Sequence, residues 1–567
     1  MKLKATIILA FLLATICSSA TKRTTAEKRM VAEQYIGTHS TRTASINLRT
    51  IMENEMLTMI GSEDNGFVIV ANDDMFFPVI GYSREAFSSD MPPGLNWFLD
   101  AAEECMREIL AGNVRYKTVT PPSDFPESLD PFLTSTWDQG NPYNKLCPGG
   151  NGTSSRLYPT GCVATALAQI MYYHKYPEVG IGDHQYSFKP QSGVGRVISA
   201  NFGETHYDWA NMLDDYSKGY TDEQANAVAT LMLHCGVAVE MGYTPSGSGS
   251  YGQEACLGLK KFFGYNKNAR LYKRDYYTME SWMKMIYREL NQKRPIYYAG
   301  NSGSSGGHAF VIDGYDKNGM VHVNWGWGGD GNGMFDIALL NPKGYQFSEG
   351  QNMIIGICDS TVAIPYESQV VADELSFTFY GSTTKRVTIS GQIYNAAAEK
   401  FIGKIGCILE NDETTIVLKT KEETTLNPVT GGSWFYTSLS LPSNNLSDIP
   451  DGTYRLFVGS RTEEDTKWQL VRTREGEVSS YIIVKNGEDI TWTEDRDDQW
   501  TSATSGISSV TKGDANGDGE VNAADIVEVA NYIMGSQSNN FMFDGADANG
   551  DRVVNAADIV KITNIAQ

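Results

Sequence analysis

Two stretches with the composition of linkers constrain the fold of this chain more than any other feature. With 567 residues the chain is too long for one hydrophobic core, and a usual domain size of roughly 150 residues predicts three or four units. A proline-rich stretch at 118–126 cannot pair regularly and favours an extended, protease-accessible linker. A Ser/Thr/Gly-rich stretch at 501–509 has the composition of a second, flexible linker. The chain is therefore expected to fold as a series of separate units.

The first twenty residues have the features of a secretory signal. Lys2 and Lys4 precede an apolar run at 7–16, and small residues end the segment at Ala20, after which we expect cleavage. No other stretch reaches the eighteen or so apolar residues that a membrane-spanning helix needs. The sequence thus predicts a signal peptide at 1–20 and a protein secreted by a bacterium, either extracellular or held at the cell surface, with no transmembrane segment.

Charge and cysteine content narrow the function classes. The 46 basic and 68 acidic residues give a net charge of −22, which argues against nucleic acid as a partner and suits an exported protein that binds calcium. Of the eight cysteines, removal of the leader takes away Cys17 and leaves an odd number, so at least one thiol stays unpaired. In an exported chain such a thiol suggests a reactive group or an intermolecular bridge.

Three units are expected between the leader and the second linker. Residues 21–125 combine helical stretches at 26–35 and 95–110 with strands at 66–71 and 77–82, which predicts a small α+β unit. Residues 126–362 are rich in Gly, Tyr and Trp, begin helical and end in short strands. Residues 363–498 alternate polar and apolar residues between turn clusters, a pattern typical of an antiparallel β-sandwich. The linker, placed at 499–510, leads to a tail at 511–567.

A cysteine stands where an amphipathic helix is expected to begin. The segment Pro159-Thr160-Gly161 precedes Cys162, and small and apolar residues follow it at helical spacing. At a helix N-terminus, unsatisfied amides and the positive end of the dipole favour the thiolate, which is the nucleophilic form. Cys162 is therefore a candidate nucleophile, although a lone cysteine beside a helix is more often an inert buried group.

A histidine and an amide complete a possible catalytic set. His308 opens an apolar strand directly after a glycine-rich loop, and sixteen residues later a second strand ends at Asn324, followed by Trp325 and Trp327. An amide oxygen that accepts from the imidazole would fix its tautomer, while indole rings exclude water. The order Cys, His, Asn therefore predicts a thiol-dependent catalytic site, with the nearby Asp313 and Asp316 left open as alternative orienting groups.

These segments resemble the streptopain-type cysteine peptidases, a bacterial branch of the papain-like fold. The resemblance rests on 160–174, 307–314 and 324–329, and it covers residues 21 to about 360, including Gly66–Ala71, which is similar to the inhibitory prodomain of that family. It implies an α+β papain-like catalytic domain at 126–362, preceded by an inhibitory prodomain at 21–125.

The resemblance also implies a role for each site residue. Cys162 is the nucleophile, His308 the general base and acid, and Asn324 with Trp325 the orienting and shielding pair. Gln139 matches the position whose side-chain amide helps form the oxyanion hole. One such donor in an oxyanion hole is worth roughly 3 to 4 kcal/mol of transition-state stabilisation. The implied reaction is hydrolysis of protein or peptide substrates through a thioester acyl-enzyme.

The tail contains a duplicated twelve-residue segment. Its two copies, at 514–525 and 547–558, place acidic and amide residues at the spacing at which oxygens converge on one calcium ion. With Asp in place of the usual Glu at position 12, the duplication resembles dockerin type I modules, which implies a small α-helical calcium-binding unit and a possible cohesin-like or cell-surface partner. Because Arg552 replaces the glycine expected at position 6, we expect the second site to bind calcium more weakly. The candidate structural calcium ligands are Asp514, Asn516, Asp518, Glu520, Asn522, Asp525, Asp547, Asn549, Asp551, Val553, Asn555 and Asp558.

Two other functions fit parts of the same pattern. A transglutaminase-like acyl transferase would use the same Cys162 and His308 with an Asp as the third member. A non-catalytic binding protein on a peptidase scaffold would present the sandwich and the tail. Because Cys162, His308, Gln139 and Asn324 occur together, the sequence favours a secreted cysteine endopeptidase made as a zymogen, with calcium in the tail and no cofactor for catalysis.

Overall fold

The structure is a computed structural model, and it describes most of the chain between residues 22 and 566. The predicted signal peptide and several predicted calcium ligands lie outside the described residues. The described ranges are 22–37, 47–88, 91–112, 118–123, 125–149, 156–188, 195–302, 306–340, 350–380, 385–428, 437–495, 513–516, 521–533, 543–546, 548 and 554–566.

The N-terminal unit is an antiparallel sheet with two helices, as the sequence indicated. The helix expected at 95–110 begins two residues earlier because Pro93 fits the first turn of a helix. The strand at 66–71 is found as expected, and the strand expected at 77–82 forms at Val79–Ser83. The elements of this unit are α1 Thr25–Gly37, β1 Arg49–Glu53, β2 Leu57–Ser62, β3 Gly66–Ala71, β4 Val79–Ser83 and α2 Pro93–Leu110.

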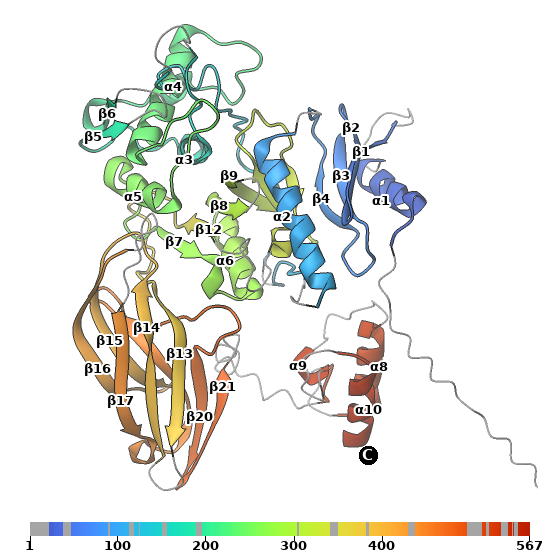
Figure 1. Cartoon of the computed structure of the whole chain (residues 1–567), viewed down its shortest axis with the longest axis vertical. Helices are drawn as coiled ribbons and strands as arrows, with labels where there is room; N and C mark the ends of the chain where they lie inside the picture. The colour runs from blue at the N-terminus through green and yellow to red at the C-terminus, as the bar shows by residue number, and fades with distance from the viewer. Residues whose placement is uncertain are drawn as a thin grey trace, which may run out of the picture.

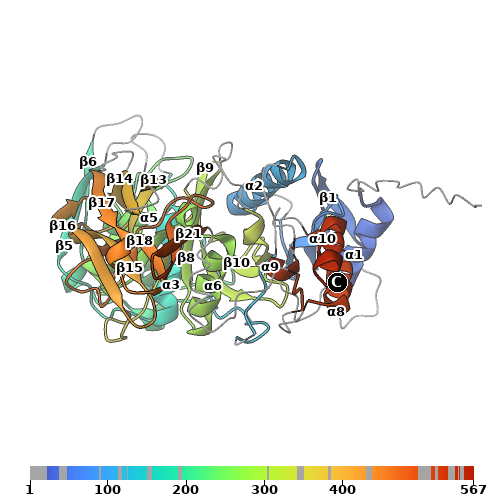
Figure 2. The ribbon, with the colours of Figure 1, turned by 90° about the horizontal axis from the view of Figure 1, so that it is seen from below.

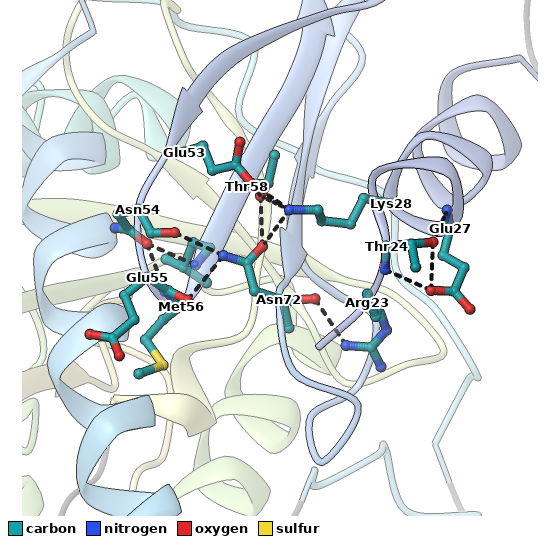
Figure 3. Close-up of polar contacts among 12 residues, drawn as sticks. Arg23, Thr24, Glu27, Lys28, Glu53, Asn54, Glu55, Met56, Thr58 and Asn72 are labelled. Carbon is teal, nitrogen blue, oxygen red and sulfur yellow. Dashed lines mark hydrogen bonds and ion pairs between the residues drawn. The ribbon is translucent and has the colours of Figure 1, made fainter. Parts of the chain in front are cut away.

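A buried polar cluster ties α1 to the sheet (Figure 3). The Lys28 ammonium donates to the Glu53 carboxylate at 2.5 Å, to the Thr58 hydroxyl at 2.8 Å and to the Asn72 amide oxygen at 3.2 Å. Asn72 in turn donates to the carbonyl of Asn54 at 2.9 Å. Because the ammonium is buried, these partners replace the water it loses. The cluster fixes α1 against β2 and β3.

The middle part of the chain has a helical half and a sheet half (Figure 1). Helices α3, α4 and α5 share one core, while α6 packs beside β8 and β9. The helices are α3 Cys162–His174, α4 Asp222–Ala238, α5 Gly252–Phe263 and α6 Met279–Asn291. The strands are β5 Asp183–Phe188, β6 Arg196–Asn201, β7 Arg270–Lys273, β8 Ile296–Ser302, β9 Gly306–Tyr315, β10 Val321–Asn324, β11 Gly333–Phe335 and β12 Asn352–Ile355. Short 3-10 helices of this part lie at Phe202–Glu204, Trp209–Asn211, Arg274–Tyr276 and Ile337–Leu339, and a further one, Leu446–Asp448, lies later in the chain between β17 and β18.

The N-terminal unit and the middle part share one sheet. Strand β4 pairs antiparallel with β11, with Tyr82 opposite Met334 and Gly81 opposite Phe335. The resulting order is β1-β2-β3-β4-β11-β10-β9-β8-β12-β7. In the turned view of Figure 2, β1 and α1 lie beyond β10, on the side away from β8. Side chains of both parts, such as Phe98 and Phe335, also belong to one hydrophobic core, so the two units expected from the sequence are continuous in space.

Two further antiparallel sheets follow and face each other across a common core. Apolar residues of both, among them Ile389, Cys407 and Leu456, form this core. One sheet holds β13 Val370–Tyr380, β14 Arg386–Asn395 and β17 Thr437–Asn445. The other holds β15 Phe401–Glu410, β16 Thr415–Leu426, β18 Gly452–Arg461, β19 Gln469–Leu470, β20 Ser480–Asn486 and β21 Asp489–Asp495.

Ion pairs fasten these sheets to the middle part of the chain. In each pair the basic side chain comes from the segment 260–274 and the acidic one from the sheets or the chain just before them. The pairs are Lys260–Glu399, Lys267–Glu464 at 2.7 Å, Arg270–Glu367 at 3.3 Å and Arg274–Glu475 at 3.2 Å.

The tail contains short helices that pack on one another. Helices α8 Ala523–Ile533 and α10 Ala556–Ile565 bury Val529 and Ile562 between them, next to the short α9 Phe543–Ala546. Among the described residues, no helix of the chain combines the length and the apolar character needed to cross a bilayer.

Candidate active site

Glycine at position 161 permits α3 to begin at Cys162. Gly161 has a φ of +90°, which favours glycine, and a Cβ there would lie 2.8 Å from the Met241 sulfur. Cys162 is the first residue of the helix and is partly exposed, while the ten residues after it are buried. Its side chain therefore lies at the positive end of a helix that is anchored in the core.

The imidazole of His308 has a defined tautomer. His308 lies near the start of β9 and is only 7% exposed, and its Nε2 is 3.1 Å from the backbone carbonyl oxygen of Trp325. A carbonyl can only accept, so Nε2 carries the proton and donates. This leaves Nδ1 as the ring atom for the hydrogen bond between the imidazole and the Cys162 thiol.

The two groups favour each other's charged forms. Burial acts to raise the pKa of the Cys162 thiol, but the hydrogen bond and charge of His308, together with the amides of Ala309 and Val163, outweigh it and lower that pKa. Burial acts to lower the pKa of His308, but the hydrogen bond and charge of Cys162 and the Trp325 carbonyl raise it overall. Each group therefore stabilises the charged form of the other, the thiolate of Cys162 and the imidazolium of His308.

The other thiols behave in the opposite way. The seven described cysteines are all free, and for each one except Cys162 the pKa is raised overall, mainly by burial. For Cys256 the pKa rises to about 11, even with Lys260 nearby to lower it. A raised pKa keeps a thiol protonated and unreactive at neutral pH. Among the described thiols, Cys162 alone thus combines partial exposure with a lowered pKa.

Asn324 reaches His308 through a peptide group rather than directly. We expected the Asn324 amide oxygen to accept from the imidazole, but in the structure the Trp325 carbonyl takes that place. The Asn324 Oδ1 instead accepts from the Gly326 N–H at 3.1 Å, and its Nδ2 donates to the Ser135 carbonyl at 2.8 Å. The Trp325 carbonyl and the Gly326 N–H belong to the same peptide group. Asn324 therefore holds the group that holds His308.

Trp325 covers the imidazole as expected for a shielding residue. Its side chain is 1% exposed, its ring centroid lies 6.2 Å from that of His308, and its Nε1 donates to the Gly331 carbonyl at 2.9 Å. Gly326 follows with a φ of +69°, a conformation that favours glycine and turns the chain directly after the carbonyl.

The two alternative orienting aspartates have other partners. Asp313, fully buried within β9, accepts from the His322 Nδ1 at 2.5 Å and from the backbone N–H groups of Phe132 and Leu133 at 2.9 and 2.7 Å. Asp316 accepts from the Tyr82 hydroxyl at 3.2 Å. The contacts found among the described residues thus give Asp313 a role in anchoring the segment that leads to Gln139, not in orienting His308.

Gln139 lies in a loop that is hydrogen-bonded to the segment just before Cys162. It is buried, and its backbone carbonyl accepts from the Thr160 N–H at 3.0 Å, two residues before Cys162. The Asp138 carboxylate accepts from the Gly140 N–H at 2.9 Å and fixes the turn around Gln139. The backbone N–H of Cys162, at the first position of α3, has no partner within its own helix.

The N-terminal unit contacts the site through Gly94 of α2. A Cβ at Gly94 would lie 2.5 Å from a carbon of the Trp325 ring and 2.6 and 2.7 Å from His308 Cδ2 and Nε2. The helix backbone thus packs directly on the imidazole. Farther along α2, the Trp97 ring lies 5.8 Å from that of Phe310 on the same strand as His308. This contact joins residues more than 200 positions apart, and sequence reasoning missed it.

Sequence reasoning also missed Gln169, two helical turns after Cys162. This fully buried amide on α3 contacts Ser135, Trp137 and Asn324. The signal that could have found it is one long polar side chain in the otherwise small and apolar run 163–171.

The tail shows half of the predicted calcium ligands. In the first repeat Asp514 and Asp525 are buried, and the Asp525 carboxylate accepts from the N–H groups of Ala515, Asn516 and Asn522. In the second, Asp558 is buried and accepts from the Asn555 N–H at 2.9 Å. Buried carboxylates at the ends of the loops fit calcium, which takes oxygen ligands. Within the described residues no cluster of three metal-binding side chains forms, and Asp518, Glu520, Asp547, Asn549, Asp551 and Val553 lie outside them.

A thiol with a lowered pKa at the start of a helix, paired with an imidazole on a strand, defines a cysteine peptidase of papain-like fold. The chain matches the Peptidase C10 family over residues 137–335, the Spi protease inhibitor over 20–106 and the Dockerin type I domain over 512–565. It is 33% identical over 331 residues to streptopain of Streptococcus pyogenes, an alignment that covers 56% of this chain and 83% of streptopain. The chain belongs to the peptidase C10 family.

Two further relatives agree with this assignment. The thiol protease/hemagglutinin PrtT of Porphyromonas gingivalis is 35% identical over 340 residues, and the alignment covers 56% of this chain but 38% of PrtT. The solved structure of a prointerpain A fragment from Prevotella intermedia is 42% identical with a TM-score of 0.52, and it matches 55% of this chain and 99% of the fragment.

Proposed function

We propose that this protein is an exported cysteine endopeptidase that is made as an inactive precursor and cleaves protein substrates. The observation that carries the proposal is the hydrogen-bonded pair of Cys162 and His308, in which the thiol pKa is lowered and the imidazole pKa is raised. Such a pair supplies both a nucleophile and a proton donor.

In the first half of the reaction, the Cys162 thiolate attacks the carbonyl carbon of the scissile peptide bond. The developing oxyanion receives hydrogen bonds from the Cys162 backbone N–H and from the Gln139 side-chain amide. The His308 imidazolium gives its Nδ1 proton to the leaving amine as the C–N bond breaks. A thioester to Cys162 remains, and His308 is neutral.

In the second half, neutral His308 takes a proton from water through Nδ1, and the oxygen attacks the thioester carbonyl. The C–S bond breaks, the acid product leaves, and the thiolate and imidazolium are restored. Throughout, the Trp325 carbonyl accepts from Nε2, so the ring keeps the orientation in which Nδ1 faces the sulfur.

Residues 21–125 act as the inhibitory part of the precursor. The contact of Gly94 with His308 and the pairing of β4 with β11 support this, because both place the N-terminal unit on the catalytic residues or beside them. Removal of this unit requires cleavage of the chain, for which the proline-rich stretch at 118–126 is the expected place. The catalytic part then extends over 126–362.

The remaining parts serve attachment and stability. The two-sheet unit at 363–498 is fastened to the catalytic part by ion pairs, and the tail at 511–567 takes structural calcium through its loop carboxylates. A dockerin-type tail suits a cohesin-like or cell-surface partner, and the signal at 1–20 suits an extracellular location. No cofactor is needed for the proposed catalysis.

The structure favours hydrolysis over a transglutaminase-like transfer. That alternative needs an aspartate on the imidazole, whereas Asp313 contacts His322 and the Nε2 of His308 contacts a carbonyl. A non-catalytic scaffold is disfavoured by the lowered pKa of Cys162, which a binding protein does not require.

The test is cleavage of an unfolded protein by the full-length protein, with the Cys162→Ala variant as control. We expect peptide products that a thiol-directed inhibitor abolishes, and a Cys162→Ala precursor that stays full-length. Mass spectrometry with an added amine separates hydrolysis from acyl transfer. Equal cleavage by the Cys162→Ala variant, or products that carry the amine in place of free acids, would overturn the proposal.

A further inference from the structure

Gln169 connects three chain segments that hold residues of the candidate site: α3 with Cys162, the segment that leads to Gln139, and the end of β10 with Asn324. Its Oε1 accepts from the Ser135 hydroxyl at 3.1 Å and from the Trp137 N–H at 3.2 Å, both in the segment that leads to Gln139. The same oxygen accepts from the Asn324 Nδ2 at 3.1 Å, and the Gln169 Nε2 donates to the Asn324 Oδ1 at 3.2 Å. Gln169 itself belongs to α3, which begins at Cys162.

The reciprocal amide pair between Gln169 and Asn324 lies at the end of a continuous hydrogen-bond chain. The Asn324 Oδ1 accepts from both Gln169 Nε2 and the Gly326 N–H. The peptide group of that N–H carries the Trp325 carbonyl, which accepts from the His308 Nε2. Donation from Gln169 to the Asn324 amide oxygen therefore helps to orient and polarise the Trp325 carbonyl, which fixes the imidazole of His308.

Because these side chains are buried, each of their polar groups needs a hydrogen-bond partner within the protein. The side chains of Gln169 and Thr165 are completely buried, and Asn324 is 2% exposed. A buried amide that lost its partners would leave unsatisfied polar groups in the core. A core position on α3 that served packing alone would suit an apolar side chain, like those of Ala166, Leu167 and Ile170 around it.

We propose that Gln169 is a positioning residue for catalysis: it sets the orientation of His308 through Asn324 and the Trp325–Gly326 peptide, and ties this network to the loop of Gln139. It does not touch the reacting atoms. The inference deepens the proposed peptidase function and rests on it. Its particular claim is that Gln169 and Asn324 act as one unit on the state of the Cys162–His308 pair.

The test compares Gln169→Met, Asn324→Ala and the double variant in the full-length protein. The first readout is the rate of Cys162 alkylation by iodoacetamide as a function of pH, which needs no turnover. The second is kcat and KM for a peptide substrate, measured after the variants are processed by immobilised wild-type enzyme that is then removed. Gln351→Met is the matched control, because Gln351 is a buried glutamine whose Oε1 accepts from the Tyr298 hydroxyl rather than from a member of this network.

We expect Gln169→Met to lower kcat about ten- to a hundredfold with little change in KM. The pH at which Cys162 becomes reactive should rise, and the double variant should be no worse than Asn324→Ala alone, because the two residues share one pathway. Gln351→Met should keep the reactivity profile of Cys162 even where it lowers thermal stability.

Three results would overturn the inference. These are an unchanged Cys162 reactivity profile in Gln169→Met, a loss that appears in KM alone, and effects of the two substitutions that simply add. If Gln169→Met does not fold, Gln169→Glu carries the same test, because its carboxylate keeps the acceptor contacts and loses the donation to Asn324. If the wild-type protein hydrolyses nothing, the proposed function fails, while the alkylation profiles still judge the role of Gln169.

Discussion

Substitution of Gly94 by valine should release the N-terminal unit from the active site. A Cβ at this position would lie 2.5 to 2.7 Å from ring atoms of Trp325 and His308, about 1 Å closer than atoms in good contact approach. The neighbours are buried rings held by hydrogen bonds, so they cannot simply turn away. Helix α2 must shift instead.

Overpacking of this kind costs about 1–3 kcal/mol, and a valine with its two further methyl groups belongs at the upper end. Three kcal/mol corresponds to a weakening of the contact by about 150-fold. We expect the precursor to be processed faster by about one to two orders of magnitude, because the strain is present only while the N-terminal unit covers His308.

The assay follows cleavage of precursors that carry Cys162→Ala, so that they cannot cut themselves, by a fixed amount of processed wild-type enzyme. Gly195→Val is the matched control, since a Cβ at the exposed Gly195 would meet only the Phe188 carbonyl at 3.9 Å. In an otherwise wild-type chain, Gly94→Val should yield a processed enzyme with unchanged kcat/KM, because the substituted segment has been removed. Equal processing rates for the two glycine variants would refute the reasoning.

The remaining predictions concern the thiolate, the oxyanion and the tail. Because His308 lowers the pKa of Cys162 against the effect of burial, alkylation by iodoacetamide should stay fast well below pH 8.5, and His308→Ala should move the midpoint above that value; a midpoint that does not move would contradict the ion pair. Gln139→Ala should lower kcat about a hundred- to a thousandfold while alkylation of Cys162 is unaffected, and a loss below tenfold would remove Gln139 from the oxyanion site. Chelation of calcium in the full-length protein should make the tail sensitive to an added protease without slowing hydrolysis of small peptides, and a tail equally resistant in chelator would argue against bound calcium. Asp525→Asn places an NH2 group among three backbone N–H donors, so titration calorimetry of this variant should show one calcium site fewer.

The sequence alone determined the local features. The sequence pattern predicted a helix at 95–110, two residues short of the start of α2 at Pro93, and it placed Cys162 at the start of a helix, as found in α3. The prediction of Cys162 as nucleophile and His308 as base also came from local context, because the effect of a helix N-terminus on a thiol depends on the residues beside it. The family resemblance indicated the catalytic residues for the same reason, since each motif is a continuous segment.

Only the tertiary structure decided which groups meet. Sequence reasoning expected the Asn324 side chain on the imidazole, but the path of the chain after β10 brings the Trp325 carbonyl there. A backbone carbonyl is present at every residue and leaves no mark in a sequence. The contact of Gly94 with His308 and the sheet shared by β4 and β11 join distant segments, and such pairings are set by the packing of whole elements. The role of Gln169 could not be predicted from the sequence for the same reason. The sequence shows a glutamine at this position, but its four side-chain hydrogen bonds form only where three chain segments converge.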